Sequence, residues 1–371
     1  MKIAVLKEQA SGESRVAASA ETVKKFIALG AEVSVEPGAG LSASVADADY
    51  AAAGATMAKD AVKGADIVLG VQGPDVAALK GANAGAWIVA GLDPFGQRAR
   101  IDAYAKAGFE ALAMEFMPRI TRAQSMDILS SQSNLSGYKA VIEAANAYGR
   151  AFPMMMTAAG TVSAAKAFVM GVGVAGLQAI ATARRLGAQV SATDVRSATK
   201  EQIMSLGAKP VFVENVAGIE GEGAGGYATE MSPEYQAAQA ELVSAHIAKQ
   251  DIVITTALIP GKAAPRLVSA AQIASMKPGS VVFDLAVAQG GNVEGSVADQ
   301  VVVQNGVKII GWSNTPAHLA ADASALFARN LYNFLSAFWD KDAGKPVLDD
   351  EIGNAVRLTL GGKVVHERLL G

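Results

Sequence analysis

Residues 167–196 read AFVMGVGVAGLQAIATARRLGAQVSATDVR, and this stretch decides the fold class. Its opening apolar run predicts a buried strand, which leads into a G-x-G-x-x-G pattern, a helix and a second strand. Gly171 permits a tight turn, Gly173 lets backbone N–H groups approach a pyrophosphate, and Gly176 lets the helix pack close to the strand. The second strand ends at Asp194, 18 residues after Gly176, where an acid can accept hydrogen bonds from ribose hydroxyls. Together these features predict a dinucleotide-binding domain.

The same stretch bears on which dinucleotide is bound. A carboxylate at Asp194 would repel a 2′-phosphate, so the sequence favours NAD(H) over NADP(H). Arg196 lies close by, and its positive charge weakens that preference a little. Two further candidate cofactor-binding residues, Ala257 and Leu258, lie at the same edge of the sheet, in the loop 255–261 after a later strand. The predicted cofactor-binding residues of this half are Gly171, Gly173, Val174, Gly176, Asp194, Val195, Arg196, Ala257 and Leu258.

Composition indicates a folded globular protein. The chain has 371 residues, 51% hydrophobic and 18% charged, which suggests two or three domains with large cores. The net charge is −3 without a basic block, which argues against nucleic-acid binding. There is no cysteine, and three scattered histidines show no ligand spacing, so no metal site is predicted. The short apolar N-terminus and the glycine-interrupted window 167–183 favour a soluble cytoplasmic chain.

Strands alternate with helices in two arrays, which predicts an α/β fold of two Rossmann-like, doubly wound parallel-sheet domains joined by long helices. The first array lies within residues 1–118 and the second within residues 153–312. The second array has six strand positions, and ligands of such sheets bind at the carboxyl ends of the strands. The expected strands are 2–6, 32–36, 65–69, 86–90 and 110–114 in the first array, and 167–170, 189–193, 210–214, 251–255, 280–285 and 301–303 with 308–310 in the second.

Two long helices are expected at the junctions of the arrays, over 127–147 and 314–338. The second would return the chain to the first domain, and a hairpin over 356–366 would follow it. The expected domains are therefore residues 1–127 plus 316–371, and the NAD(H)-binding domain 128–315.

Two segments between these elements are candidates for function. Residues 217–232, AGIEGEGAGGYATEMS, predict a glycine-rich lid in which Tyr227, beside Gly226, could cover a bound cofactor. A plain surface loop is the alternative. Residues 117–136, MPRITRAQSMDILSSQSNLS, are dense in side-chain donors and acceptors. This segment is either a ligand-binding loop or a solvated connection between domains.

These motifs resemble one family along nearly the whole chain: the NAD(H)-binding component of proton-translocating nicotinamide nucleotide transhydrogenase, in bacteria a separate piece of the alpha subunit. The resemblance rests on RAQSMDILSSQSN, GVGVAGLQAIATARRLGA, GGYATEM, ITTALIPGKAAP, MKPGSVVFDLAVAQGGN and NTPAHLAADAS. The first of these is far more specific than the glycine pattern.

The resemblance implies a homodimer that docks on a membrane proton-channel component and on a separate NADP(H)-binding component. It would be attached peripherally to the cytoplasmic face of the inner membrane. Hydride would pass directly between the two nicotinamides, coupled to proton movement elsewhere. The family's site residues correspond to Asp194 for the ribose, Gly226 and Tyr227 for the mobile loop, and Arg119, Gln124, Asp127 and Ser130 for the nicotinamide.

Direct hydride transfer exchanges no proton with solvent, so no general acid or base is expected. Arg119, Gln124 and Asp127 are accordingly interpreted as residues that position the nicotinamide.

The rival enzyme class is alanine dehydrogenase, which shares the fold and resembles the chain around Arg15. That family uses a lysine and a histidine in the first domain, at positions that fall near Gly70 and Gly91 here. Neither residue is present, so oxidative deamination would be hard to catalyse and Arg15 is interpreted as structural. The transhydrogenase pattern also has polar residues near these two positions, so a third hypothesis is an NAD-binding module that has lost transfer activity.

Overall fold

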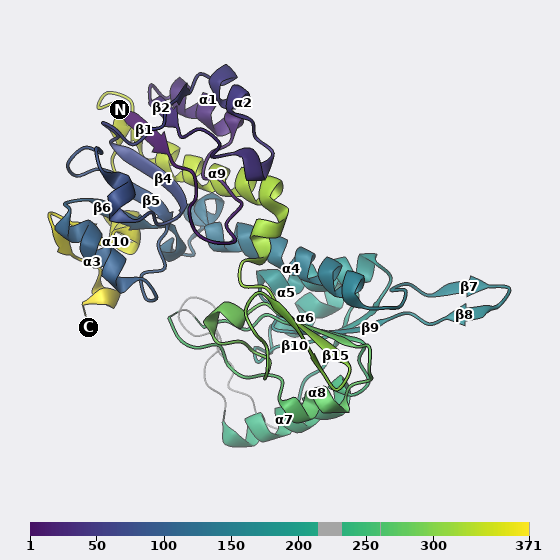
Figure 1. The fold of residues 1–371 in the computed structure, drawn as a ribbon. Coiled ribbons are helices and arrows are strands. Elements are labelled where there is room, and N and C mark those ends of the chain that lie inside the picture. Colours follow the sequence, from purple (N-terminus) through teal and green to yellow (C-terminus); the bar gives the residue numbers. More distant parts are fainter. Residues whose placement is uncertain (214–231, 260, 371) are drawn as a thin grey trace. The chain divides into compact units, whose positions relative to one another are not determined.

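The computed structural model of the chain describes residues 1–213, 232–259 and 261–370. It has two compact units, one formed by Met1–Gln132 with Pro316–Gly371 and the other by Ser133–Thr315. Each unit is built on a parallel or mostly parallel sheet with helices packed against it (Figure 1). The predicted fold class is thereby confirmed. Among the described residues, no helix combines the length and the apolar character that crossing a membrane requires.

The first unit contains a six-stranded parallel sheet in the order β3-β2-β1-β4-β5-β6. Successive residues of its strands face opposite sides, because Ile3 and Val5 lie in one buried cluster and Ala4 in the other. The first cluster also contains apolar residues of α1 and α9, and the second those of α3. The strands are β1 (Lys2–Val5), β2 (Glu32–Val35), β3 (Thr56–Met57), β4 (Ile67–Gln72), β5 (Trp87–Gly91) and β6 (Glu110–Ala113), and the helices α1 (Ala20–Ala28), α2 (Asp47–Ala52), α3 (Arg98–Lys106), α9 (Ala320–Ala337) and α10 (Asp350–Val356).

The second unit contains a seven-stranded sheet in the order β11-β10-β9-β12-β13-β15-β14. Ala167 and Val169 of its central strand pack with α4 and α5, while Phe168 packs on the other face with α7 and α8. The strands are β9 (Lys166–Met170), β10 (Gln189–Thr193), β11 (Lys209–Pro210), β12 (Ile252–Thr255), β13 (Val281–Asp284), β14 (Gln300–Gln304) and β15 (Val307–Gly311), and the helices α5 (Val174–Arg185), α6 (Thr199–Ser205), α7 (Pro233–Ile247) and α8 (Ala270–Ser275).

One long helix, α4 (Ile128–Ala147), begins in the first unit and continues into the second, close to the range expected from the sequence. Short 3-10 helices complete the connections, among them η4 (Thr121–Met126) and η6 (Thr315–Leu319). The helix expected over 314–338 begins only at Ala320, because η6 precedes it. The return to the first unit is therefore made by η6 and not by α9.

Four antiparallel hairpins among the described residues differ from the expected pattern. The segments 301–303 and 308–310, expected to fill one strand position, are two antiparallel strands, β14 and β15. They are joined at Asn305 and Gly306, whose φ angles are 50° and 78°. The tail has a helix, α10, capped by Asp349, and only Thr359–Leu360 (β18) pairs with Lys363–Val364 (β19). The unpredicted hairpins are β7 (Met155–Thr157) with β8 (Gly160–Val162), and β16 (Trp339–Asp340) with β17 (Lys345–Pro346).

Candidate functional site

The glycine-rich turn joins the central strand β9 of the second unit to helix α5. Gly171 has φ +97°, a left-handed conformation that other residues rarely adopt. A Cβ on Gly176 would lie 1.9 Å from the Gly171 carbonyl oxygen, so only glycine lets α5 begin this close to the strand. A Cβ on Gly173, just before Val174, would meet no described atom within 4 Å. Among the described residues, the space beside Gly173 is therefore open next to the N-terminus of α5, whose N–H groups could bind a phosphate.

Asp194 follows the neighbouring strand β10 and contacts this turn directly. Its Oδ2 accepts a hydrogen bond from the backbone N–H of Val172 at 2.7 Å. Its Oδ1 accepts from the backbone N–H of Arg196 and from Arg196 Nε, both at 2.9 Å. Burial opposes ionisation of this carboxyl, but the bonds from Arg196 and Val172 outweigh burial and lower its pKa. A carboxylate is thus held ionised beside the predicted pyrophosphate turn.

The loop after β12 is fastened to the same turn. Thr256 Oγ1 donates to the carbonyl oxygen of Gly171 at 3.0 Å. The side chain of Asn292 binds both backbone polar groups of the next residue, Ala257. The Ala257 N–H donates to Asn292 Oδ1 at 3.1 Å, and the Ala257 carbonyl accepts from Asn292 Nδ2 at 2.9 Å. Leu258 follows and is exposed. The loop therefore presents backbone and an apolar side chain beside Gly171.

Asn292 and Asp284 hold the loop after β12 in place, and the sequence analysis does not single them out. Asp284 ends β13, is fully buried, and accepts N–H bonds from Ala286, Asn292 and Val293. These bonds hold Asn292 in place to bind Ala257. A carboxylate at the end of a buried strand, followed by two glycines and an asparagine, was the available signal.

The segment that contains Arg119 and Gln124 belongs to the first unit. Its backbone is held by α9, because Asn330 and Asn333 both donate to the carbonyl oxygen of Ser125, at 2.8 and 3.1 Å. Ala123 and Met126 are buried, whereas Arg119 and Gln124 are exposed. The two polar side chains are thus carried on a fixed backbone, an arrangement suited to binding.

Asp127 and Ser130 are joined to each other at the start of α4. The Asp127 carboxylate accepts the backbone N–H of Ser130 at 3.0 Å and its hydroxyl at 2.6 Å. This is the geometry of a helix N-cap, so Asp127 stabilises the first turn of α4. Both side chains are half-buried.

Arg15 is enclosed by a polar cluster in the first unit. It forms an ion pair with Glu13 at 2.7 Å, and its Nη1 donates to Gln132 Oε1 at 2.9 Å. Glu13 also accepts from Gln72 at 2.9 Å. Burial opposes ionisation of Glu13, but the bonds to Arg15 dominate and lower its pKa to about 2. The Arg15 guanidinium is therefore engaged within the protein, which is consistent with its interpretation as structural.

Gly70 and Gly91 lie in tight surroundings. A Cβ on Gly70 would lie 2.5 Å from the carbonyl oxygen of Gln72, where the β4–β5 register is irregular. A Cβ on Gly91 would lie 3.1 Å from the carbonyl oxygen of Val71. A lysine at position 70 would therefore require the end of β4 to rearrange.

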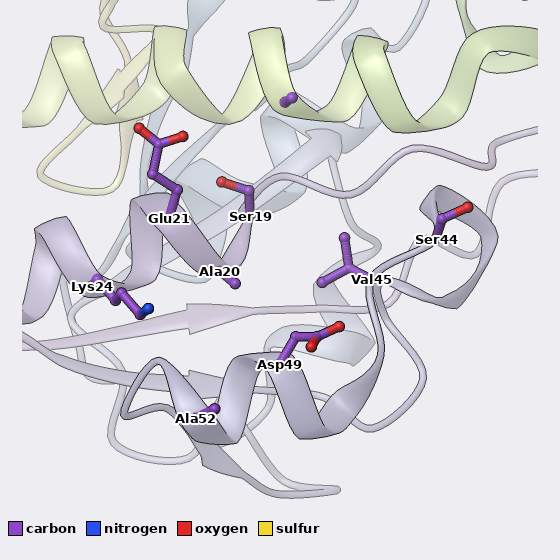
Figure 2. A pocket seen from close by; sticks show the side chains of 9 residues that line it. Ser19, Ala20, Glu21, Lys24, Ser44, Val45, Asp49 and Ala52 are labelled. Carbon is purple, nitrogen blue, oxygen red and sulfur yellow. The ribbon is translucent and has the colours of Figure 1, made fainter.

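Within the described ranges, no group of three or more metal-ligating side chains is present. A shallow pocket of about 410 Å³ lies in the first unit among α1, α2 and α9 (Figure 2). It is lined by small side chains with Lys24, Glu21 and Asp49, and it includes none of the predicted site residues. Gly226 and Tyr227, the predicted lid residues, lie outside the described residues.

A doubly wound sheet, a glycine turn at the end of its central strand and an acid at the end of the next strand define a dinucleotide-binding α/β protein. The chain belongs to the alanine dehydrogenase/PNT family. The family's N-terminal domain, "Alanine dehydrogenase/PNT, N-terminal domain", matches residues 4–136, and "Alanine dehydrogenase/PNT, C-terminal domain" matches residues 140–367. The family resemblance predicted from the motifs is thereby confirmed.

Known proteins agree with this assignment. The chain is 53% identical to an alpha-subunit protein of the NAD(P) transhydrogenase of Rhodospirillum rubrum, over 100% of this chain and 99% of the relative. The crystal structure of transhydrogenase from Sinorhizobium meliloti superposes on this chain with a TM-score of 0.90, over 98% of this chain and 100% of that one. The two sequences are 54% identical. An alanine dehydrogenase of Halomonas elongata is 28% identical over 95% of this chain and 91% of the relative.

Proposed function

We propose that this chain is the NAD(H)-binding component of a proton-translocating transhydrogenase. The observation that carries the proposal is the 2.7 Å bond from the Val172 N–H to Asp194, since it fixes the predicted ribose acid beside the predicted pyrophosphate turn. The low pKa of Asp194 supports NAD(H) over NADP(H), because an ionised carboxylate repels a 2′-phosphate. The R. rubrum relative, matched from end to end, supports the transhydrogenase assignment.

The bound nicotinamide supplies the carbon that gives or takes the hydride. The chain contributes orientation, because the transfer needs no general acid or base. We propose that Arg119, Gln124 and Asp127 hold the nicotinamide carboxamide, with Ser130 as a further contact. The fixed backbone of this segment and the exposure of Arg119 and Gln124 support that role. Asp127 has a second role as helix cap, so its substitution affects stability as well.

We further propose a homodimer that works with an NADP(H)-binding component and a membrane proton-channel component, attached at the cytoplasmic face of the inner membrane. The β7–β8 hairpin projects from the rest of the second unit (Figure 1). Exposed methionines at its start support the dimer, because a partner would cover them. Met154 is 62% exposed and Met156 is 78% exposed.

The test is a titration of intrinsic Trp fluorescence with NADH and with NADPH, followed by mixing with an NADP(H)-binding transhydrogenase component. Tighter binding of NADH, lost in Asp194→Ala, and transfer between the two nucleotides are expected. Equal affinities for the two nucleotides would contradict the role of Asp194. NADH binding without transfer would support the alternative of a binding module that has lost activity.

A further inference from the structure

The Asp194 carboxylate has four hydrogen-bond donors around it. Oδ1 accepts from the Arg196 N–H and from Arg196 Nε, and Oδ2 accepts from the Val172 N–H and from Arg196 Nη2 at 3.0 Å. A carboxylate offers about four lone-pair sites, so these donors saturate it. Two ribose hydroxyls can bind Asp194 only when two of the present donors leave.

Two of the four donors are backbone N–H groups, and the other two belong to a side chain. The N–H groups of Val172 and Arg196 belong to the backbone of the glycine turn and of the segment after β10, so they cannot leave without unmaking those segments. The other two belong to the guanidinium of Arg196, whose side chain is 18% exposed and can rotate about its own torsions. The guanidinium supplies two bonds, which is the number that two ribose hydroxyls would require.

We propose that Arg196 is a specificity-determining residue that occupies the ribose-binding face of Asp194 and must be displaced by the nucleotide. The inference rests on the proposed function, because it assumes that Asp194 binds the ribose. Displacement opposes NADH binding, since an ion pair with two hydrogen bonds is exchanged for two neutral hydroxyl donors. Arg196 is therefore a residue that weakens the affinity for NADH.

The same displacement reduces the difference in affinity between NADH and NADPH. Once turned away from Asp194, the guanidinium is a cation close to the ribose acid, and cations of this kind accommodate a 2′-phosphate in related folds. Arg196 thus offsets part of the repulsion between Asp194 and that phosphate. Removing the guanidinium should raise affinity for NADH and lower it for NADPH.

The experiment compares the wild-type chain with Arg196→Ala, Arg196→Gln and the control Arg185→Ala by fluorescence titration with NADH and NADPH. Arg185 is an exposed cation in the last turn of α5, so its removal changes the net charge of the same unit equally. In both Arg196 variants the NADH Kd should fall about three- to tenfold, the range expected when a partly exposed ion pair no longer has to be broken. The NADPH Kd should rise, and Arg185→Ala should change neither.

Thermal unfolding gives a second readout that does not depend on affinity in the wild type. Without nucleotide, Arg196→Ala should unfold at a lower temperature than the wild type, because Asp194 retains only its backbone donors. Saturating NADH should then raise its unfolding temperature by more than it raises that of the wild type. Arg196→Gln, with a smaller loss of stability, guards against a variant that fails to fold.

The outcomes separate the two proposals. If no variant and no wild-type protein binds NADH, the proposed function fails. If the wild type binds NADH and the Arg196 variants bind it equally or more weakly, only the role of Arg196 is overturned, and weaker binding would make Arg196 a direct nucleotide contact.

Discussion

Gly137 packs against the backbone of Ala175, so that α4 touches the first turn of α5 directly. A Cβ on Gly137 would lie 2.0 Å from the Ala175 carbonyl oxygen. The helix that Asp127 caps, next to the proposed nicotinamide-binding segment, thereby also supports, within the second unit, the helix that begins at the glycine turn.

Gly137→Ala should destabilise the protein, although glycine to alanine inside a helix ordinarily stabilises it by up to about 1 kcal/mol. The clash with Ala175 should cost about 1–3 kcal/mol and shift the N-terminus of α5, so NADH binding should weaken. Chemical denaturation and NADH titration measure both effects. Gly149→Ala is the control, because a Cβ there meets no described atom within 4 Å and its φ is not positive. An increase in stability for Gly137→Ala would contradict the contact.

Glu115→Gln should raise stability at alkaline pH. Burial raises the pKa of Glu115 to about 7, against hydrogen bonds from Leu92 and Asp93 that lower it. The folded protein therefore binds a proton that the unfolded chain has released, and the free energy of unfolding falls as pH rises from 4.5 through 7. The N–H groups of Leu92 and Asp93 both donate to Oε1, and Oε2 has no partner among the described residues, so an amide in place of Oε2 breaks no existing hydrogen bond. Relative to wild type, the free energy of unfolding of the variant should rise by about 3 kcal/mol at pH 8 and change little at pH 4.

The measurement is urea denaturation of the two proteins between pH 4 and pH 8. Glu110→Gln, at a partly exposed position, serves as the control for loss of one carboxylate. Parallel pH profiles for Glu115→Gln and wild type would show that Glu115 does not titrate in this range.

Gln124→Ala should slow hydride transfer while leaving NADH affinity and stability nearly unchanged. The side chain is exposed on η4, whose backbone is held by Asn330 and Asn333, so its removal disturbs no packing. Stopped-flow transfer in a complex reconstituted with an NADP(H)-binding component measures the rate. Thr121→Ala, also exposed on η4, should transfer at the wild-type rate. An unaltered rate in Gln124→Ala would remove the positioning role.

Met156→Lys should weaken the proposed dimer, because it places a charge in an apolar contact. Sedimentation should show a larger fraction of monomer at micromolar concentration. Met204→Lys changes another exposed methionine, 54% exposed on α6, and should leave the oligomer intact. Equal dissociation of both variants would point to a general effect of charge and not to the hairpin.

Alanine should not support reduction of NAD+ by this chain. Arg15 is already bound by Glu13 and Gln132, and Gly70 leaves no room for a side chain at the end of β4. Steady-state absorbance at about 340 nm, where the reduced nicotinamide absorbs, should stay at the background level with alanine. Appreciable turnover would revive the alanine dehydrogenase alternative.

The sequence predicted what depends on periodicity and on glycine. The central strands and the glycine turn stand within a few residues of their expected positions, because buried parallel strands are continuous apolar runs and φ > 0 requires glycine. It did not predict β7–β8, whose strands have three residues each and little burial, so neither length nor alternation signals them. It also did not predict the role of Asn292 or the close contact between Gly137 and Ala175. Those roles are defined by contacts between segments that are distant in the chain, which no local pattern encodes.

The bridge from Asp284 through Asn292 to Ala257 also constrains how this sequence can diverge. The side-chain amide of Asn292 binds both the N–H and the carbonyl of Ala257. The backbone N–H of Asn292 is itself held by the buried carboxylate of Asp284, which ends another strand. Aspartate in place of Asn292 would bring two carboxylates together and lose the donor to the Ala257 carbonyl. Shortening either loop by one residue would break the match of donors to acceptors. A change at either loop or at Asp284 therefore needs a compensating change in the others, so the three segments can evolve only as a set.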